Sequence, residues 1–278
     1  MKRTRKQTLE QVSVEPDVVP TQANESNDRF FVTALARGLA VLQTLATAQE
    51  PRTVSQLSRM VGLPQPTVWR LCHTLHELGY IERVSEDHLR PGIKALALGY
   101  STLANRTLVD LAKPQMTLLA NRFSGAVSLG VECDAKMLYI ARVESREPVF
   151  PGLRPGSTVS MLTTGMGWAY LGALDTERRT NLLEKACKMY PEEHARAYPL
   201  IEKALVEYRS QGFVTNMGIF HPELNAVGAP VINAQGEVLA ALSCGGHRSL
   251  FTQKILAEQV GPALRDFGND LGVLGMNF

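Results

Sequence analysis

The sequence lacks any uninterrupted apolar stretch close to the roughly 20 residues that a membrane-spanning helix needs. No apolar core or small-residue cleavage site follows the basic residues of Met1–Glu10, so a secretory signal is not expected. The four cysteines form no Cys-x-x-Cys pair, which argues against a zinc ribbon and against a disulfide framework. These absences predict a cytoplasmic protein that has reduced thiols and no membrane partner.

Signatures of catalysis are also scarce. The sequence contains no phosphate-binding loop, no Gly-x-Ser-x-Gly elbow and no His-Glu-x-x-His zinc motif. The Gly-Met-Gly run at Gly165 lacks the third glycine of a dinucleotide-binding loop and favours a turn that begins a helix. Cys244 has no evident base partner. Because His194, His221 and His247 are widely scattered, we expect no metal site, no cofactor, no catalytic residue and no enzyme activity.

Acidic side chains are missing from one window of the chain. The formal net charge is only +2 and the pI is near 8.3, well short of the strongly basic balance of a pure nucleic-acid binder. However, the window from Arg52 to His76 contains three arginines and no Asp or Glu. This local imbalance predicts a small positive face.

Three short helices are expected after Thr33. Apolar residues at three- and four-residue spacing indicate the first. The second begins with a capping pattern, Thr53 with Gln56 three residues on, and ends at Gly62. The third follows Pro64, and its expected buried stripe is Val68, Leu71, Cys72, Leu75 and Leu78. Two short helices joined by a Gly-Leu-Pro turn, with another helix ahead of them, predict a helix-turn-helix.

A short hairpin is expected directly after the third helix. Tyr80–Val84 alternates as a strand, Ser85–His88 is a polar turn, and Leu89–Gly92 is the returning strand. A hairpin in this position is the wing of a winged helix-turn-helix, which lies along a phosphate strand or a minor groove. The domain therefore predicts double-stranded DNA as a partner.

The outward face of the third helix carries side chains that reach base edges and phosphates. Gln65 suits adenine, Thr67 suits a thymine methyl group or a phosphate, and Arg70 suits guanine or the backbone, unless it braces neighbouring helices instead. The expected DNA-binding residues are Thr53, Gln65, Thr67, Trp69, Arg70, His73, Arg83 and Arg90. The alternative is a winged-helix module for protein contacts, without sequence-specific DNA binding.

Four runs of sequence carry a family resemblance. They are Ala34-Leu-Ala-Arg-Gly-Leu-Ala-Val-Leu, Gly62-Leu-Pro-Gln-Pro-Thr-Val-Trp-Arg-Leu, Leu78-Gly-Tyr-Ile and Ala97-Leu-Gly-Tyr. Together they resemble the isocitrate lyase regulator (IclR) family over nearly all of residues 28–278. The resemblance implies an N-terminal winged helix-turn-helix, a C-terminal effector-binding domain similar to a GAF fold, and a homodimer or a dimer of dimers. Pro66 stands where the family often has a small hydroxyl residue.

The second half predicts mixed helices and strands, and thus an α+β fold class with a GAF-like α/β effector-binding domain. Helices are expected over Ile93–Leu119, with Pro114 as an interruption, and over Thr164–Leu174, Glu177–Cys187, Pro199–Gln211 and a segment after Thr252. Strands are expected over Val127–Val131, Met137–Arg142, Ala226–Ile232 and Val238–Ser243. We therefore divide the chain into a disordered tail (1–27), a DNA-binding domain (28–92), a linker helix (93–112) and an effector-binding domain (113–278).

The family resemblance also implies an effector pocket. The turn Thr164-Gly-Met166 offers backbone N–H groups at a helix start, which suit a carboxylate. The expected effector-binding residues are Thr164, Gly165, Met166, Asn216, Ala226, Ser243 and Gly245. Ala226 and Gly245 replace side chains that are polar in family members binding small keto acids. Because Leu153, Met161, Leu162 and Trp168 lie nearby in the sequence, we expect an aromatic or larger organic acid.

These expectations combine into a ligand-responsive transcriptional regulator of a catabolic operon. Ligand binding is expected to favour one arrangement of paired DNA-binding heads over another, which changes their spacing on a palindromic operator. Both repression and activation agree with this mechanism.

Overall fold

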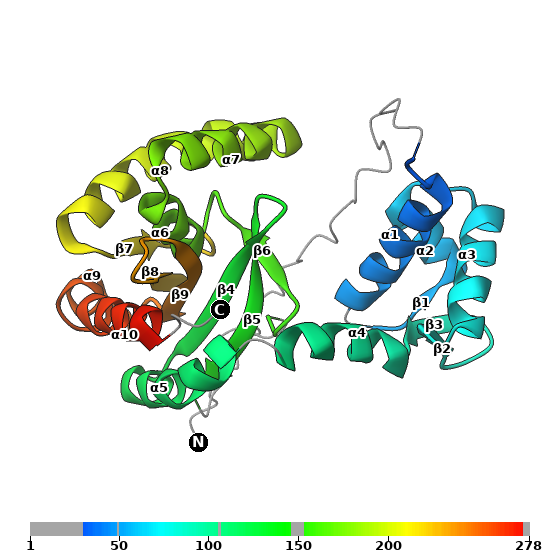
Figure 1. The fold of residues 1–278 in the computed structure, drawn as a ribbon, viewed down its shortest axis with the longest axis horizontal. Helices are drawn as coiled ribbons and strands as arrows, with labels where there is room; N and C mark the ends of the chain where they lie inside the picture. Colours follow the sequence, from blue (N-terminus) through cyan, green and yellow to red (C-terminus); the bar gives the residue numbers. More distant parts are fainter. Residues whose placement is uncertain (1–29, 49, 105–106, 146–152, 275–278) are drawn as a thin grey trace, which may run out of the picture. The chain divides into compact units, whose positions relative to one another are not determined.

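The computed structural model describes residues 30–48, 50–104, 107–145 and 153–274, and Figure 1 shows its helices and strands. The chain divides into two compact units, Met1–Thr102 and Leu103–Phe278. This division falls within residues 93–112, where a linker is expected. The tail expected over residues 1–27 lies outside the described residues.

The N-terminal unit packs three helices against a small antiparallel sheet (Figure 1). Its elements are α1 (Thr33–Thr47), β1 (Arg52–Thr53), α2 (Val54–Val61), α3 (Gln65–Glu77), β2 (Ile81–Arg83) and β3 (His88–Pro91). The sheet order is β1-β3-β2. This arrangement confirms the expected helix-turn-helix and its wing. The sequence does not reveal β1, because two residues are too few to show alternation.

The core of the N-terminal unit forms where the three helices meet the sheet. Its buried members are Val41, Leu45, Leu57, Val61, Val68, Cys72, Ile81 and Leu89. Leu78, expected in the buried stripe of α3, is instead 51% exposed. The reason is that α3 ends at Glu77, so Leu78 caps the helix and leaves its apolar face.

The segment expected as one linker helix contains two helices. Helix α4 spans Ile93–Ala104 and α5 spans Thr107–Phe123. The expected interruption at Pro114 is wrong, because Pro114 lies inside α5. A proline inside a helix costs about 3 kcal/mol. Packing of the buried side chains Met116, Leu119 and Ala120 from the same helix offsets that cost.

The C-terminal unit is built on a six-stranded antiparallel sheet of order β6-β5-β4-β9-β8-β7. The strands are β4 (Ala126–Cys133), β5 (Lys136–Glu144), β6 (Thr158–Ser160), β7 (Val214–Met217), β8 (Leu224–Ile232) and β9 (Val238–His247). The helices are α6 (Gly165–Ala173), α7 (Thr176–Met189), α8 (Pro191–Gln211), α9 (Gln253–Ile255), the π-helical turn Leu256–Val260 and α10 (Gly261–Leu274). This confirms the α+β class.

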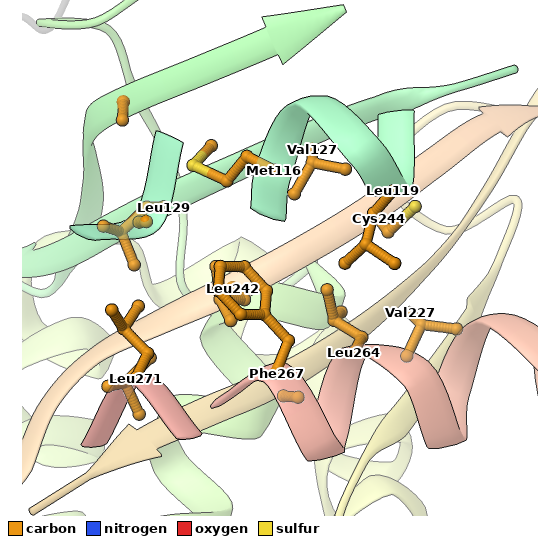
Figure 2. Close-up of a cluster of buried hydrophobic side chains, with 14 of the residues drawn as sticks. Met116, Leu119, Val127, Leu129, Val227, Leu242, Cys244, Leu264, Phe267 and Leu271 are labelled. Atoms are coloured by element: carbon orange, nitrogen blue, oxygen red, sulfur yellow. The ribbon is translucent and has the colours of Figure 1, made fainter. Parts of the chain in front are cut away.

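One face of this sheet packs against α5 and α10 and forms the main core. Figure 2 shows Met116 and Leu119 of α5 and Leu264, Phe267 and Leu271 of α10 with side chains of the sheet between them. The strand residues on this side are Val127, Leu129, Val227, Leu242 and Cys244. Alternate residues of the same strands face the opposite side, which α6 covers.

Strands β6 and β7 and the start of α8 differ from the sequence prediction. Strands β6 and β7 were not predicted, because three or four residues carry too little alternation. Helix α8 begins at Pro191 rather than Pro199, which lies inside it. Ile201, Ala204 and Leu205 are buried and anchor the helix past Pro199.

Candidate DNA interface and effector pocket

Helix α2 is fixed by a complete capping box. The Thr53 hydroxyl accepts from the Gln56 backbone N–H (3.2 Å), and the Gln56 side chain accepts from the Thr53 N–H (2.8 Å). Thr53, expected to bind DNA, is therefore already engaged in capping, although it also lines a groove beside α3. Its hydroxyl contributes about 1 kcal/mol through the cap.

The turn between α2 and α3 depends on glycine. Gly62 has φ of 65°, a left-handed conformation that glycine adopts without steric cost. The Ser58 hydroxyl donates to the Leu63 carbonyl (2.6 Å) and ties the turn to α2. These bonds set the direction in which α3 leaves the turn.

Three expected reading residues recur every four residues along one face of α3. Gln65, Trp69 and His73 line a groove of about 390 Å³ between α3 and the wing. Trp69 is 52% exposed, and its ring stacks on that of His73 with centroids 5.4 Å apart and planes inclined by 4°. The structure therefore gathers these three side chains on one exposed surface.

Arg70 and Thr67 lie further round α3. Arg70 is exposed, and the structure records no ion pair for it with any described residue, so it does not brace a neighbouring helix through a carboxylate. Thr67 is half-buried, and its N–H donates to the Pro64 carbonyl (3.0 Å) in the first turn.

The wing carries both signs of charge. Arg83 lines the groove, whereas Arg90 pairs with Glu82 on the adjacent strand (2.9 Å). Glu86 and Asp87, which sequence reasoning left aside, also line the groove. Their carboxylates repel phosphates but accept hydrogen bonds from cytosine amino groups. The groove is therefore less positive than the acid-free window predicts.

The expected effector residues border one cavity of about 70 Å³ in the C-terminal unit. All seven line it: Thr164, Gly165, Met166, Asn216, Ala226, Ser243 and Gly245. One water molecule needs roughly 10 to 15 Å³ of such space, so the cavity suits a small molecule. The structure thus brings together residues that lie as far as 81 positions apart, from Thr164 to Gly245.

The cavity meets the N-terminus of α6. The Thr164 hydroxyl caps this helix by accepting from the Gly167 N–H (3.2 Å), and it donates to the Ser160 carbonyl (2.6 Å). The first N–H groups of a helix have no intrahelical acceptor. Because Thr164 satisfies those of Gly167 and Trp168, the N–H groups of Gly165 and Met166 are the ones that suit an anion.

The part of the sheet at the cavity carries small residues paired across the strands. Ser128 lies opposite Ser243, and Ser243 opposite Gly228. In the next row, Ala126 lies opposite Gly245, which lies opposite Ala226. Gly228 permits α6 to reach the sheet, because a Cβ there would lie 1.9 Å from the Gly165 carbonyl oxygen.

Asn216 organises the wall of the cavity. It is 2% exposed, its amide donates to the Thr163 carbonyl (2.9 Å), and its carbonyl accepts from the N–H groups of Ile219 and Phe220. These bonds hold the segments on both sides of the cavity. Asn216 therefore borders the cavity, but both its amide NH₂ and its amide oxygen already form hydrogen bonds within the protein.

The apolar wall differs from the one expected. Met161, Leu162 and Trp168 are buried elsewhere, and the Trp168 indole N–H donates to the Leu162 carbonyl (2.6 Å). Of the four expected apolar residues, only Leu153 lines the cavity. The remaining apolar lining comes from Tyr139, Met166, Phe220 and Leu224. Sequence proximity misled here, because α6 turns Trp168 away from its own N-terminus.

Sequence reasoning missed a charged residue in the cavity. Arg142 lines it although its side chain is only 8% exposed. Its guanidinium donates to the Ser128 hydroxyl (2.9 Å) and forms an ion pair with Glu144. Burial raises the pKa of the nearby Tyr139 phenol, while Arg142 and a hydrogen bond with Ser128 act in the opposite direction. Tyr139 is therefore a neutral phenol near pH 7.

The thiols and histidines serve packing or surface contacts. Cys244 lies in the core, where burial raises its pKa to about 12, so it is not an activated nucleophile. His247 contacts Glu223 (3.3 Å) and His194 tilts against Tyr198 at the surface. Within the described ranges, no group of three His, Cys, Asp or Glu side chains is placed to hold a metal ion. In the same ranges, no helix is both long and apolar enough to cross a bilayer.

Comparison with known proteins identifies the family of each half of the chain. Residues 34–85 match the family described as IclR helix-turn-helix domain, and residues 100–273 match bacterial transcriptional regulator IclR C-terminal. The chain is 28% identical over 263 residues to the Pca regulon regulatory protein of Pseudomonas putida, covering 92% of this chain and 90% of that protein. These matches favour DNA binding over a module for protein contacts alone.

Solved structures give the same result. An IclR family transcriptional regulator from Brucella abortus is 30% identical, with a TM-score of 0.75 over 91% of this chain and 97% of that chain. An IclR homologue from Microbacterium hydrocarbonoxydans, solved with 4-hydroxybenzoate, shares the fold at 23% identity. Its TM-score is 0.68, and the match covers 86% of this chain and 97% of that chain. The chain belongs to the IclR family and is a ligand-responsive, DNA-binding transcriptional regulator.

Proposed function

We propose that the effector of this regulator is an aromatic carboxylic acid bound at the N-terminus of α6. The observation that carries the proposal is the cavity itself, which is lined both by the first residues of α6, Gly165 and Met166, and by small residues of the sheet. Tyr139, Phe220 and Leu224 add aromatic and aliphatic walls. Apolar walls with a few fixed polar groups favour a planar apolar body that carries one anionic group. The 4-hydroxybenzoate held by the Microbacterium homologue supports this ligand class.

On DNA, we propose that α3 enters the major groove with Gln65, Trp69 and His73 toward the base edges. Arg70 and Arg83 are exposed beside this face and reach phosphates. Thr67 is a secondary contact, because it is half-buried. Thr53 acts through the cap of α2, and Arg90 acts through its pair with Glu82. The domain limits in this proposal are those expected from the sequence, with residues 93–112 as the linker.

We propose that the protein acts as a homodimer, or as a dimer of dimers. Leu35 (63% exposed) and Leu39 (49%) leave an apolar stripe on α1, and Ile93 (71%) and Leu96 (62%) leave another on α4. Apolar stripes of this kind mark protein interfaces. Paired heads would read two half-sites, and effector binding would change their spacing on DNA. In this proposal the protein has no catalytic role and works in the cytoplasm.

Calorimetry on the full-length protein tests the effector class. We expect benzoate and its ring-substituted relatives to bind, whereas acetate and pyruvate bind at least about tenfold more weakly, since they bury less apolar surface. Gel shifts on the DNA upstream of its own gene, with and without the bound acid, test the coupling. Failure of every aromatic acid to bind would contradict the proposed ligand, and DNA affinity independent of salt would contradict phosphate contacts.

A further inference from the structure

A β-bulge brings two polar side chains of β5 to the cavity. Along β4 and β5, Leu129 lies opposite Ala141 and Gly130 lies opposite Tyr139, so Ile140 is an extra residue without an opposite partner. Because of this extra residue, Tyr139 and Arg142 lie on the same face although they are three positions apart. Ile140 and Ala141 both join the core on the other face.

The Arg142 guanidinium still has donors to offer. Its Nε–H and one Nη2–H point to Glu144, and one Nη1–H donates to the Ser128 hydroxyl (2.9 Å). A guanidinium carries five N–H groups, so two have no acceptor among the described residues. Because the side chain lines the cavity, those two N–H groups can donate to a ligand that enters it.

A second hydroxyl lies between Arg142 and α6. Ser243 is half-buried and lines the cavity, and its side-chain hydroxyl has no hydrogen bond to any described residue. It stands on β9, one strand beyond Ser128 in the row that runs from Arg142 to Gly228. A ligand oxygen near Arg142 can therefore also contact the Ser243 hydroxyl.

The two anchors belong to the same face of the sheet and lie two strands apart. The guanidinium sits by Ser128 on β4 and the start of α6 sits on Gly228 of β8, two strands further. Two strand spacings amount to about 10 Å. Hydrogen bonds of roughly 3 Å at each end take up part of this span. In the next row of the sheet, Ala226 and Gly245 add little side-chain volume, which leaves room for a ring beside the two anchors.

Because of these contacts, we propose that Arg142 and Ser243 form a second subsite, which recognises a hydroxyl group opposite the carboxylate of the aromatic effector. A hydroxyl is favoured over a second carboxylate, because Glu144 already neutralises Arg142 and would repel another negative charge. The hydroxyl accepts from Arg142 and exchanges a hydrogen bond with Ser243. This inference rests on the proposed function, since it assumes that an aromatic carboxylate occupies the cavity.

Calorimetry with three acids on the full-length protein tests the subsite. We expect 4-hydroxybenzoate to bind at least about tenfold more tightly than benzoate, the gain expected from a hydrogen bond to a charged group. Terephthalate, which carries a carboxylate in place of the hydroxyl, should bind more weakly than 4-hydroxybenzoate. In Arg142→Gln the preference for 4-hydroxybenzoate over benzoate should fall below about threefold, while benzoate itself still binds at α6.

Two further variants provide a second test of the subsite and a control. Glu144→Gln leaves Arg142 unneutralised, so it should improve terephthalate binding relative to 4-hydroxybenzoate, and it remains informative if Arg142→Gln does not fold. Arg209→Gln removes an exposed arginine of α8 and should leave all three affinities unchanged. A preference for the hydroxyl that persists in Arg142→Gln, or is absent in the wild-type protein while benzoate binds, overturns the inference. If no aromatic acid binds, the proposed function fails instead.

Discussion

Trp69 and His73 lie with their rings parallel, their centroids 5.4 Å apart and their planes inclined by 4°. Both residues stand on the exposed face of α3, one helical turn apart. The stack holds two large side chains in one orientation before DNA arrives. Preorganisation of this kind reduces the conformational entropy that binding would otherwise remove, about 0.5–1.5 kcal/mol for each side chain.

Removing the larger ring should weaken DNA binding. We expect Trp69→Ala to lose about tenfold in affinity for the operator, because the contact surface of Trp69 and the orientation of His73 are lost together. Gel shifts measure the change, and circular dichroism should show an intact fold. Tyr198→Ala, an exposed aromatic residue of α8, provides the control. Equal operator affinities for both variants would remove Trp69 from the interface.

Arg70→Ala should weaken binding to the DNA upstream of the gene without unfolding the protein, since Arg70 is exposed. If Arg70 contacts a phosphate, the loss of affinity should be the same on every DNA sequence. The slope of the logarithm of affinity against the logarithm of salt concentration should then become shallower by about one unit. If it contacts guanine, the loss should reach about 1–3 kcal/mol at one operator position only. An unchanged affinity on every sequence would exclude both contacts.

Neutralising the wing carboxylates should strengthen binding. Glu86 and Asp87 line the groove beside α3, so in the proposed complex their negative charges would lie near the DNA phosphates. We expect Glu86→Gln with Asp87→Asn to raise affinity for nonspecific DNA several-fold, about 0.5–1 kcal/mol at low salt, with a smaller gain at high salt. Glu258→Gln, an exposed acid of the C-terminal unit, is the control. Weaker binding would instead indicate that these carboxylates read base edges.

Filling the cavity floor should separate effector binding from DNA binding. A Cβ at Gly245 would lie 2.8 Å from the Ala226 Cβ, so Gly245→Ala raises the floor beneath the ligand. We expect effector affinity to fall at least about tenfold, in line with overpacking of about 1–3 kcal/mol, while operator binding stays. Gly38→Ala in α1, where the added atom makes ordinary contacts, serves as the control. A normal effector affinity would place the ligand elsewhere.

The buried thiols should resist alkylation. Burial raises the pKa of Cys72 to about 11 and that of Cys244 to about 12, from ordinary values near 9. Since the thiolate is the reactive form, both should stay unmodified at pH 8, whereas Cys133 should react because it is exposed, although partial burial and Asp134 raise its pKa too. Above pH 9 the unfolded chain loses thiol protons that the folded chain keeps, so stability should fall between about pH 9 and 12. Rapid labelling of Cys244 in native protein, read by mass spectrometry, would contradict its burial.

The DNA-binding half could be predicted from the sequence more completely than the effector pocket. Helix period, the Thr53–Gln56 cap and Gly62 are local signals, and each acts within a few residues. The pocket depends on strand register. A single unpaired residue, Ile140, determines that Arg142 lies on the cavity face of β5. No local pattern marks a bulge, so an arginine in an alternating strand indicates only a solvent-facing side chain.

Two prolines also show where prediction from the sequence fails. Pro114 and Pro199 suggested helix ends, yet both lie inside helices. Tertiary burial of neighbouring side chains outweighs the local penalty, and burial is not visible in a single sequence. Asn216 was predicted as a ligand contact, and whether it touches the effector stays a prediction. Its hydrogen bonds to Thr163 and Phe220 already give it a structural role, which is to connect these two segments.

The contact between Gly228 and the carbonyl of Gly165 leaves no space for a side chain. The start of α6 is therefore seated directly on the β8 backbone and cannot move toward the sheet when a ligand arrives. We expect it to behave as a pivot: an effector that pushes on α6 tilts the helix about this end, so the largest displacement occurs at its other end. There Gly172 lies against Tyr208 of α8, a contact in which a Cβ would come within 2.8 Å of the ring. A small tilt of α6 at the ligand would therefore produce a larger displacement where Gly172 contacts α8.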